Sequence, residues 1–200
     1  MEQKYQDLNN LRNMMRVEKD LDLLLDFIVQ ESARIVNAER ASLFLYDEDT
    51  NQLSTKIALG TSEIIHIDSN SGIAGEVFST GKVHIIHDAY KNQQFNSSID
   101  EKTGYKTKSI LCVPLNNIEG KSIGVLQALN KKDGLFASED IKIIEIFSSN
   151  AAVAIENARL IHDLAGSKKN LQIENKLLKE PAEPHVHSLP CYDTLRYNAA

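Results

Sequence analysis

Hydrophobic positions along the first third of the chain follow helical spacing and then strand spacing. Apolar residues at helical spacing predict a weakly amphipathic lead-in helix in 1–19, and a stronger helix in 21–36 that Asp20 is expected to cap. The runs 41–47 and 52–59 alternate apolar and polar residues. The acidic residues between these runs are typical of a hairpin turn, so the two runs predict a pair of antiparallel strands.

The middle of the chain continues with short elements. A glycine-containing segment, 69–82, predicts a helix that ends at Gly81. A short strand is expected at 83–89. After a polar loop, the apolar runs 108–115 and 122–130 are separated by a turn segment, and they predict a second hairpin.

A long helix is predicted from Ser138, which precedes two acidic residues that suit the positive end of a helix. Its continuation at 165–180 keeps heptad spacing and predicts a two-stranded parallel coiled coil, with a solvated helix end as the alternative. The heptad positions are Ile161, Leu164, Lys168, Leu171, Asn175 and Leu178. The segment 181–200 has no regular period and is interpreted as a linker or a non-native tail.

This order of elements, with five strands in all, is typical of an α+β domain in which helices pack on one antiparallel sheet. The domain is expected at 20–164. Its terminal helices are expected to cover the face of the sheet away from any ligand.

Composition and charge narrow the function classes. The chain has 200 residues, 42% of them hydrophobic, which is enough for a core without disulfides. A net charge of −6 argues against a general nucleic-acid binder. Cys112 and Cys191 lie far apart, which suits a reducing compartment. Without a run of transmembrane length or a signal-peptide pattern, we expect a cytoplasmic protein with no membrane contact.

Motifs for catalysis or metal binding are weak. The segment 75–82 resembles the end of a phosphate-binding P-loop, but its glycines are one residue too far apart and Val83 replaces the metal-binding hydroxyl residue. His84 and His87 are three residues apart on a predicted strand, so their side chains point to opposite faces. We therefore predict neither a metal site nor a catalytic constellation.

The polar loop 92–108 is the strongest candidate for a site. It carries Asp100, Thr103 and Thr107, whose spacing of three and four brings them together if the loop is locally helical. Two interpretations remain open on these grounds. The three side chains line a small pocket, or they only cap local backbone groups.

Three separated motifs, in this order, resemble a GAF domain. They read GIAGEVFSTGK at 72–82, DAYKNQQFNSSIDEKTGYKTKSILCVPL at 88–115 and SIGVLQALNKKDGLFASED at 122–140. The variety most similar to this chain is that of cyclic-nucleotide phosphodiesterases and bacterial adenylyl cyclases. The resemblance implies a PAS-like antiparallel sheet of about six strands, with terminal helices on one face and a pocket-forming loop on the other.

One family signature concerns structure rather than ligand. The pattern Asn-Lys…Phe-x-x-x-Asp-Glu is matched by Asn130, Lys131, Phe136 and Asp140, with Ile141 in place of the final Glu. The resemblance implies that the lysine and the aspartate pair as a structural lock.

The resemblance also implies a ligand site. The residues expected to form it are Ser42, Ala58, Leu59, Ile73, Ala74, Asn96, Asp100, Thr103, Thr107 and Gln127. Ser42 matches a purine-contacting serine, and Ile73 and Ala74 match backbone donors to a cyclic phosphate at a helix start. In the loop, Asp100, Thr103 and Thr107 match family side chains that close over ribose and phosphate. Gln127 stands where family members have Glu or Gln.

Three positions depart from the cGMP-binding members of the family. Ala58 and Leu59 stand where those members have an aromatic residue followed by Asp, and Asn96 stands where they have Tyr. A purine would therefore lose a stacking ring and the carboxylate that reads the edge of guanine. The absence of that carboxylate favours adenine over guanine as the base of the ligand.

The resemblance therefore implies a regulatory sensor without catalysis and without a resident cofactor. We expect it to bind a cyclic nucleotide, cAMP in preference to cGMP, and to relay the signal through a helical homodimer to an effector domain. The alternative is a ligand-free GAF module for dimerisation and signal relay. A third hypothesis, an enzyme acting through Cys112 as in GAF-like methionine sulfoxide reductases, is disfavoured because no second cysteine neighbours it.

Overall fold

The computed structural model describes residues 21–58 and 64–179. The lead-in helix expected at 1–19, the ligand residue Leu59 and the segment 181–200 lie outside the described residues. The chain divides into two compact units, Met1–His162 and Asp163–Ala200, and the first contains the whole sheet. Among the described residues, no helix combines the length and the apolar character needed to cross a membrane.

The first unit is built on one six-stranded antiparallel sheet with the strand order β3-β2-β1-β6-β5-β4. The strands are β1 (Ala38–Asp47), β2 (Gln52–Ala58), β3 (His66–Asp68), β4 (His84–Ile86), β5 (Ile110–Asn116) and β6 (Ser122–Lys131). The long central strands β1 and β6 pair over most of their length, and both predicted hairpins, β1–β2 and β5–β6, are present. The expected α+β class is confirmed.

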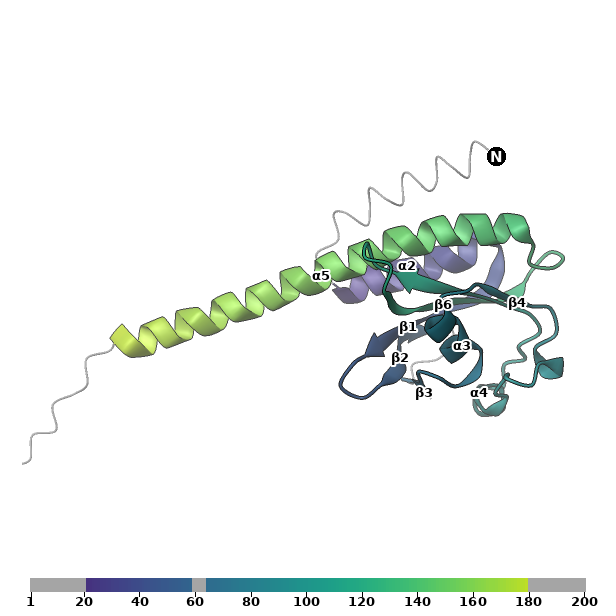
Figure 1. The fold of residues 1–200 in the computed structure, drawn as a ribbon, viewed down its shortest axis with the longest axis horizontal. Helices are drawn as coiled ribbons and strands as arrows, with labels where there is room; N and C mark the ends of the chain where they lie inside the picture. The colour runs from purple at the N-terminus through teal and green to yellow at the C-terminus, as the bar shows by residue number, and fades with distance from the viewer. Residues whose placement is uncertain (1–20, 59–63, 180–200) are drawn as a thin grey trace, which may run out of the picture. The chain divides into compact units, whose positions relative to one another are not determined.

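Helices lie on both faces of this sheet. They are α2 (Leu21–Ile35), α3 (Gly72–Thr80), the short 3-10 helix η1 (Ala89–Lys91), α4 (Ser98–Thr103) and α5 (Ser138–Lys179). Figure 1 shows α2 and the first part of α5 on one side of the sheet, and α3 and α4 on the other. The terminal helices and the loop helices therefore occupy opposite faces.

Strand alternation separates two hydrophobic cores. Leu43 and Leu45 of β1 pack with buried residues of α2 and α5, such as Leu24 and Phe147. Phe44, between them in sequence, belongs to a second cluster that includes residues of α3. Because successive side chains of a strand point to opposite faces, one strand contributes to both cores.

The expected elements differ from the observed ones in three places. The hydrophobic pattern predicts five strands, whereas the structure has a sixth, β3, at the edge beside β2. Only Ile67 of its three residues is half-buried, so β3 is too short for alternation to be visible in the sequence. The strand expected at 83–89 ends at Ile86, and the loop 92–108 contains α4.

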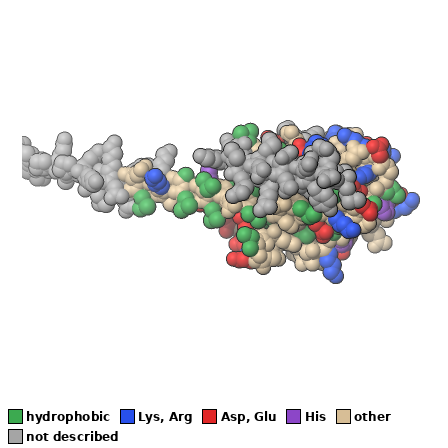
Figure 2. Space-filling model, turned by 90° about the horizontal axis from the view of Figure 1, so that it is seen from above, with side chains coloured by type: hydrophobic (Ala, Val, Ile, Leu, Met, Phe, Trp, Pro, Cys, Tyr) green, Lys and Arg blue, Asp and Glu red, His purple; other side chains and the backbone are tan. Residues whose placement is uncertain are grey.

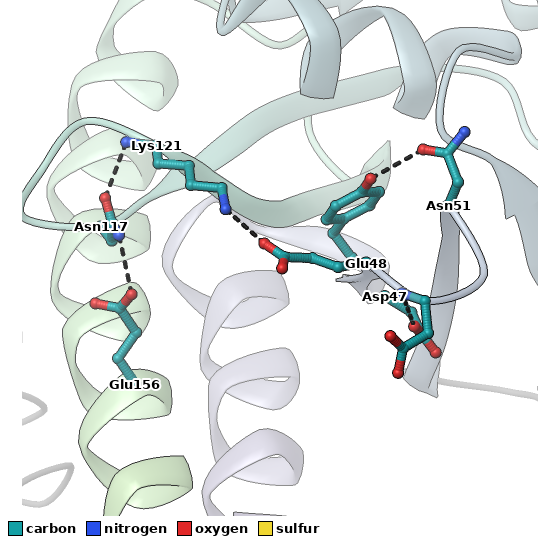
Figure 3. Close-up of polar contacts among 8 residues, drawn as sticks. Asp47, Glu48, Asn51, Asn117, Lys121 and Glu156 are labelled. Atoms are coloured by element: carbon teal, nitrogen blue, oxygen red, sulfur yellow. Dashed lines mark hydrogen bonds and ion pairs between the residues drawn. The ribbon is translucent and has the colours of Figure 1, made fainter.

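Polar contacts tie the two hairpin turns to each other and to α5 (Figure 3). Asn117 Nδ2 donates to Glu156 Oε1 at 3.0 Å, and Asn117 Oδ1 accepts from the backbone N–H of Lys121 at 2.8 Å. The Lys121 ammonium pairs with Glu48 in the β1–β2 turn. Tyr46 donates its hydroxyl to Asn51 across the same turn. These contacts hold both turns in fixed positions beside the helix.

Candidate functional site

A cavity of about 570 Å³ lies on the face of the sheet opposite α2 and α5. It is bounded by β1 and β6, by β3, by the start of α3 and by the pocket loop, which we define as residues 92–108. Its volume lies within the range of about 300–1,000 Å³ that is usual for small-molecule sites.

The floor of the cavity comes from the two central strands. Arg40, Ser42 and Phe44 alternate along β1 and all three line the cavity. On β6, Gln127 lies opposite Ser42 and Leu129 lies opposite Arg40. Because residues two apart on a strand share a face, the strand register alone brings these five side chains together.

The start of α3 forms one wall. Gly72 adopts a φ of +68°, which glycine reaches without strain, and Ile73 and Ala74 follow it as almost fully buried lining residues. At Gly75 a Cβ would lie 2.8 Å from the backbone carbon of Asn70, so only glycine lets α3 approach this closely. The first amides of a helix have no acceptor within the helix, which makes this wall able to bind an anion.

The carboxylate of Asp100 closes the pocket loop on itself. Its Oδ1 accepts from the Thr107 hydroxyl at 2.8 Å, and its Oδ2 accepts from the Thr107 backbone N–H at 2.7 Å and from the Tyr90 hydroxyl at 2.9 Å. This hydrogen bond to Asp100 raises the pKa of the Tyr90 hydroxyl. We call these three residues the Asp100 clasp. It positions the loop with protein groups alone.

Thr107 does not reach Asp100 through a helical turn, as the spacing suggested. The helix α4 ends at Thr103, and Gly104, with a φ of +67°, reverses the chain so that Thr107 returns to Asp100. The Thr103 hydroxyl instead donates to the Ile99 carbonyl at 2.8 Å. The local-capping interpretation therefore describes Thr103 well, while Asp100 and Thr107 contact each other.

Asn130 anchors the end of the pocket loop to β6. Its Oδ1 accepts from the backbone N–H groups of Lys108 at 2.6 Å and Ser109 at 3.2 Å. Its Nδ2 donates to the Lys106 carbonyl at 2.9 Å and to Glu39 Oε2 at 3.0 Å. This one side chain thus binds the backbone of Lys106, Lys108 and Ser109, just before β5 begins.

Glu39 and Tyr105 extend this anchor. The Tyr105 hydroxyl donates to Glu39 Oε2 at 2.9 Å. The hydrogen bond from Asn130, followed by the one from Tyr105, lowers the pKa of Glu39. Burial and then the bond to Glu39 raise the pKa of Tyr105, so its hydroxyl stays a neutral donor.

The ion pair implied between Lys131 and Asp140 is present, with Lys131 Nζ 2.6 Å from Asp140 Oδ1 and both side chains largely buried. Asp140 Oδ2 also accepts from the Ala137 backbone N–H at 3.0 Å, at the start of α5. Lys131 lies 5.8 Å from the centre of the Phe136 ring. The pair joins the end of β6 to the start of α5 and does not line the cavity.

The cavity brings most of the expected ligand residues together. Those that line it are Ser42, Ile73, Ala74, Asn96, Asp100, Thr103, Thr107 and Gln127. Ala58 lies opposite Ser42 in the pairing of β1 with β2, and its side chain, like the whole of Leu59, is outside the described part. Sequence reasoning missed Arg40 and Tyr105, although the alternation of β1 places Arg40 on the face of Ser42.

Neither Cys112 nor His84 is among the residues that line the cavity, whereas His66 lines it and its Nδ1 lies 2.8 Å from the Ser54 hydroxyl. Cys112 is fully buried in β5, and burial raises the pKa of its thiol to about 12, which keeps the nucleophilic thiolate scarce at neutral pH. His84 Nδ1 lies 3.5 Å from the Glu76 carboxylate. In the described part of the chain, no three His, Cys, Asp or Glu side chains are grouped to hold a metal ion.

Comparison with known proteins gives the family. The family model described as GAF domain matches residues 20–155. The chain belongs to the GAF domain family. The GAF domain from an Acinetobacter phosphoenolpyruvate-protein phosphotransferase superposes with a TM-score of 0.69 at 18% identity, covering 80% of this chain and 98% of that one. At this identity the likeness shows the fold, and the GAF fold is confirmed.

Two relatives are phosphodiesterases. The chain is 35% identical over 190 residues to the dual 3',5'-cyclic-AMP and -GMP phosphodiesterase 11A of Takifugu rubripes, covering 84% of this chain and 21% of that protein. It is 37% identical over 160 residues to the cGMP-specific 3',5'-cyclic phosphodiesterase of Drosophila sechellia, covering 72% and 13%. The chain thus spans 21% and 13% of the length of these two relatives, and its similarity to them supports a small-molecule sensor role.

Proposed function

We propose that this GAF domain is a regulatory sensor that binds a cyclic nucleotide, cAMP in preference to cGMP, in the cavity under the pocket loop. The observation that carries the proposal is the cavity itself, which has a volume of about 570 Å³ under a loop that the hydrogen bonds from Thr107 to Asp100 close. On this account the domain is cytoplasmic and has no catalytic role of its own.

The cavity offers partners for each part of a cyclic nucleotide. The amides at Ile73 and Ala74, at the start of α3, suit the cyclic phosphate. Ser42 and Gln127, opposite each other on the floor, provide a hydroxyl and an amide for the edge of a base. The names of the relatives given above, which include cyclic-AMP and cyclic-GMP phosphodiesterases, support this ligand class.

The preference for adenine rests on the sequence. Ala58 and Leu59 supply no carboxylate for the N–H groups on the edge of guanine, and buried donors without acceptors are costly. Gln127 has both a donor and an acceptor, so its amide can pair with adenine in one of its two orientations.

We propose that the signal leaves the domain along α5 in a homodimer. Ile161 and Leu164, at two of the expected heptad positions, are 53% and 69% exposed. Figure 2 shows further hydrophobic side chains along the later part of this helix. Burial of such side chains against a second copy is the usual reason for an exposed heptad. The division into a sensor at 20–164 and a relay helix at 165–180 is part of the proposal.

Thermal unfolding with ligand tests the sensor function. At 100 times the dissociation constant, cAMP should raise the melting temperature by about 5–10 °C, and the same concentration of cGMP should raise it less. Gln127→Ala should reduce the cAMP shift, whereas Ser149→Ala, a control on the exposed face of α5 whose hydroxyl contacts only Glu145, should not. No shift with either nucleotide at millimolar concentration would contradict the proposal.

One observation favours the second candidate, a ligand-free GAF module for dimerisation and relay. The Asp100 clasp closes the pocket loop through three hydrogen bonds between protein groups, an arrangement suited to a loop with a structural role. If this candidate is correct, the domain should dimerise and show the same hydrogen-exchange pattern with and without nucleotide.

A further inference from the structure

Arg40 places a positive charge in the cavity, but it is not among the residues expected to bind the ligand. It lies on β1, half-buried, and it lines the cavity. Among the described residues, no carboxylate forms an ion pair with its guanidinium within 4.0 Å. Its contact is instead with an aromatic face, because Arg40 Cζ lies 3.9 Å from the centre of the Tyr105 ring. Its charge adds to the hydrogen bonds from Asn130 and Tyr105 that lower the pKa of Glu39. A half-buried arginine that forms no close ion pair with a described carboxylate keeps hydrogen-bonding and stacking capacity for a ligand.

The ring under this guanidinium is held in place. The Tyr105 hydroxyl donates to Glu39, and Glu39 also accepts from Asn130, the residue that anchors the pocket loop. Tyr105 follows α4 directly after Gly104, so the loop itself carries the ring to β1. The planar guanidinium is therefore supported on one face by a ring whose position is fixed from both the sheet and the loop.

The guanidinium lies beside the groups suited to a base. Arg40 is two residues from Ser42 on the same face of β1, and the β6 residues opposite them, Leu129 and Gln127, line the same floor. Ala58 and Asn96 provide no aromatic ring on which a base could stack. Arg40 adds a flat cation to a cavity that the rings of Phe44 and Phe95 also line.

We propose that the face of the Arg40 guanidinium turned away from Tyr105 is the surface on which a planar purine base stacks. This inference rests on the proposed function and adds a specificity-determining residue to it. Arginine planes stack on nucleobases and on aromatic rings, and a lysine ammonium has no plane to offer. The cavity should therefore select flat heteroaromatic ligands over sugars and aliphatic acids that carry the same phosphate or carboxylate charge.

Three variants test the inference on the whole chain. Arg40→Met removes charge and plane, Arg40→Lys keeps the charge but removes the plane, and Lys142→Met is a control that removes an exposed cation from α5, away from the cavity. Calorimetric titration with cAMP and with adenosine, which has the base without the phosphate, gives the affinities. Circular dichroism and thermal unfolding without ligand show that each variant is folded.

Stacking predicts that both Arg40 variants bind cAMP about tenfold more weakly and lose the same factor for adenosine, while Lys142→Met stays within about twofold of the wild type. If Arg40→Lys retains full affinity, or if only cAMP binding is weakened, Arg40 acts through its charge on the phosphate and the inference is wrong. Unchanged affinity in both variants also overturns it, while the sensor function stands. Failure of the wild-type chain to bind any cyclic nucleotide would instead contradict the proposed function.

Discussion

The two faces of the sheet use the same strands but are stabilised in different ways. The face under α2 and α5 is closed by large, fully buried apolar side chains such as Leu24, Phe147 and Ile155. The other face has a smaller apolar cluster and leaves a cavity, and its loop is held by individual hydrogen bonds to Asp100 and Asn130. The first face should therefore determine the stability of the domain, and the second should determine what it binds.

A large-to-small substitution on each face tests this division most strongly. Phe147→Ala removes a ring that is 1% exposed from the helix-covered core and should lower the free energy of unfolding by about 3–5 kcal/mol. Phe95→Ala removes a partly buried ring of the pocket loop, which packs against Tyr90 at 5.2 Å, and should cost only about 1–2 kcal/mol. Urea unfolding measures both. Equal losses would show that the two faces contribute equally to stability.

The Asp100 clasp gives the next largest effect. Asp100→Ala removes the acceptor of three hydrogen bonds and should weaken cAMP binding by about 1.5–3 kcal/mol, because the pocket loop no longer closes in one position. Glu101→Ala is the matched control, since this neighbouring side chain is exposed and bonds only to Ser97. Calorimetric titration gives both affinities. A similar loss in the two variants would mean that the clasp does not order the site.

The smallest effect concerns pH and the anchor at Glu39. The pKa of Glu39 is lowered in the folded chain, chiefly by the hydrogen bond from Asn130, so the ionised form stabilises the fold at neutral pH. This contribution should be complete above the unfolded value of 4.5 and should be lost as the pH falls through the lower folded value. It is small because solvent screens this largely exposed group. Urea unfolding of the wild type and of Glu39→Gln, measured between pH 7 and pH 3, gives the two midpoints. The midpoints should converge at low pH. A difference that stays constant with pH would show that the charge of Glu39 has no role.

The two faces also differ in how far the sequence predicts them. Helical spacing in α2, alternation in β1 and β6 and the continuous apolar run of β5 predict the elements that form the apolar face. The edge strand β3 has three residues and no visible period, so it could be expected only from the family resemblance.

The cavity face depends on contacts that local patterns do not contain. The floor residues Ser42 and Gln127 meet through strand register, 85 positions apart in the sequence by their numbers. The clasp forms because Gly104 reverses the chain, and the stack of Arg40 on Tyr105 forms because the loop returns to β1. Spacing within the loop suggested a helical cluster of three side chains, whereas the fold pairs only two of them.

Hydrogen–deuterium exchange with and without saturating cAMP is the most direct test of the central claim. If the cavity is the cyclic-nucleotide site, exchange should slow at the start of α3, around residues 72–75, and in the pocket loop, while α2 on the opposite face should not change. No change in either of those two regions at millimolar cAMP would contradict the account.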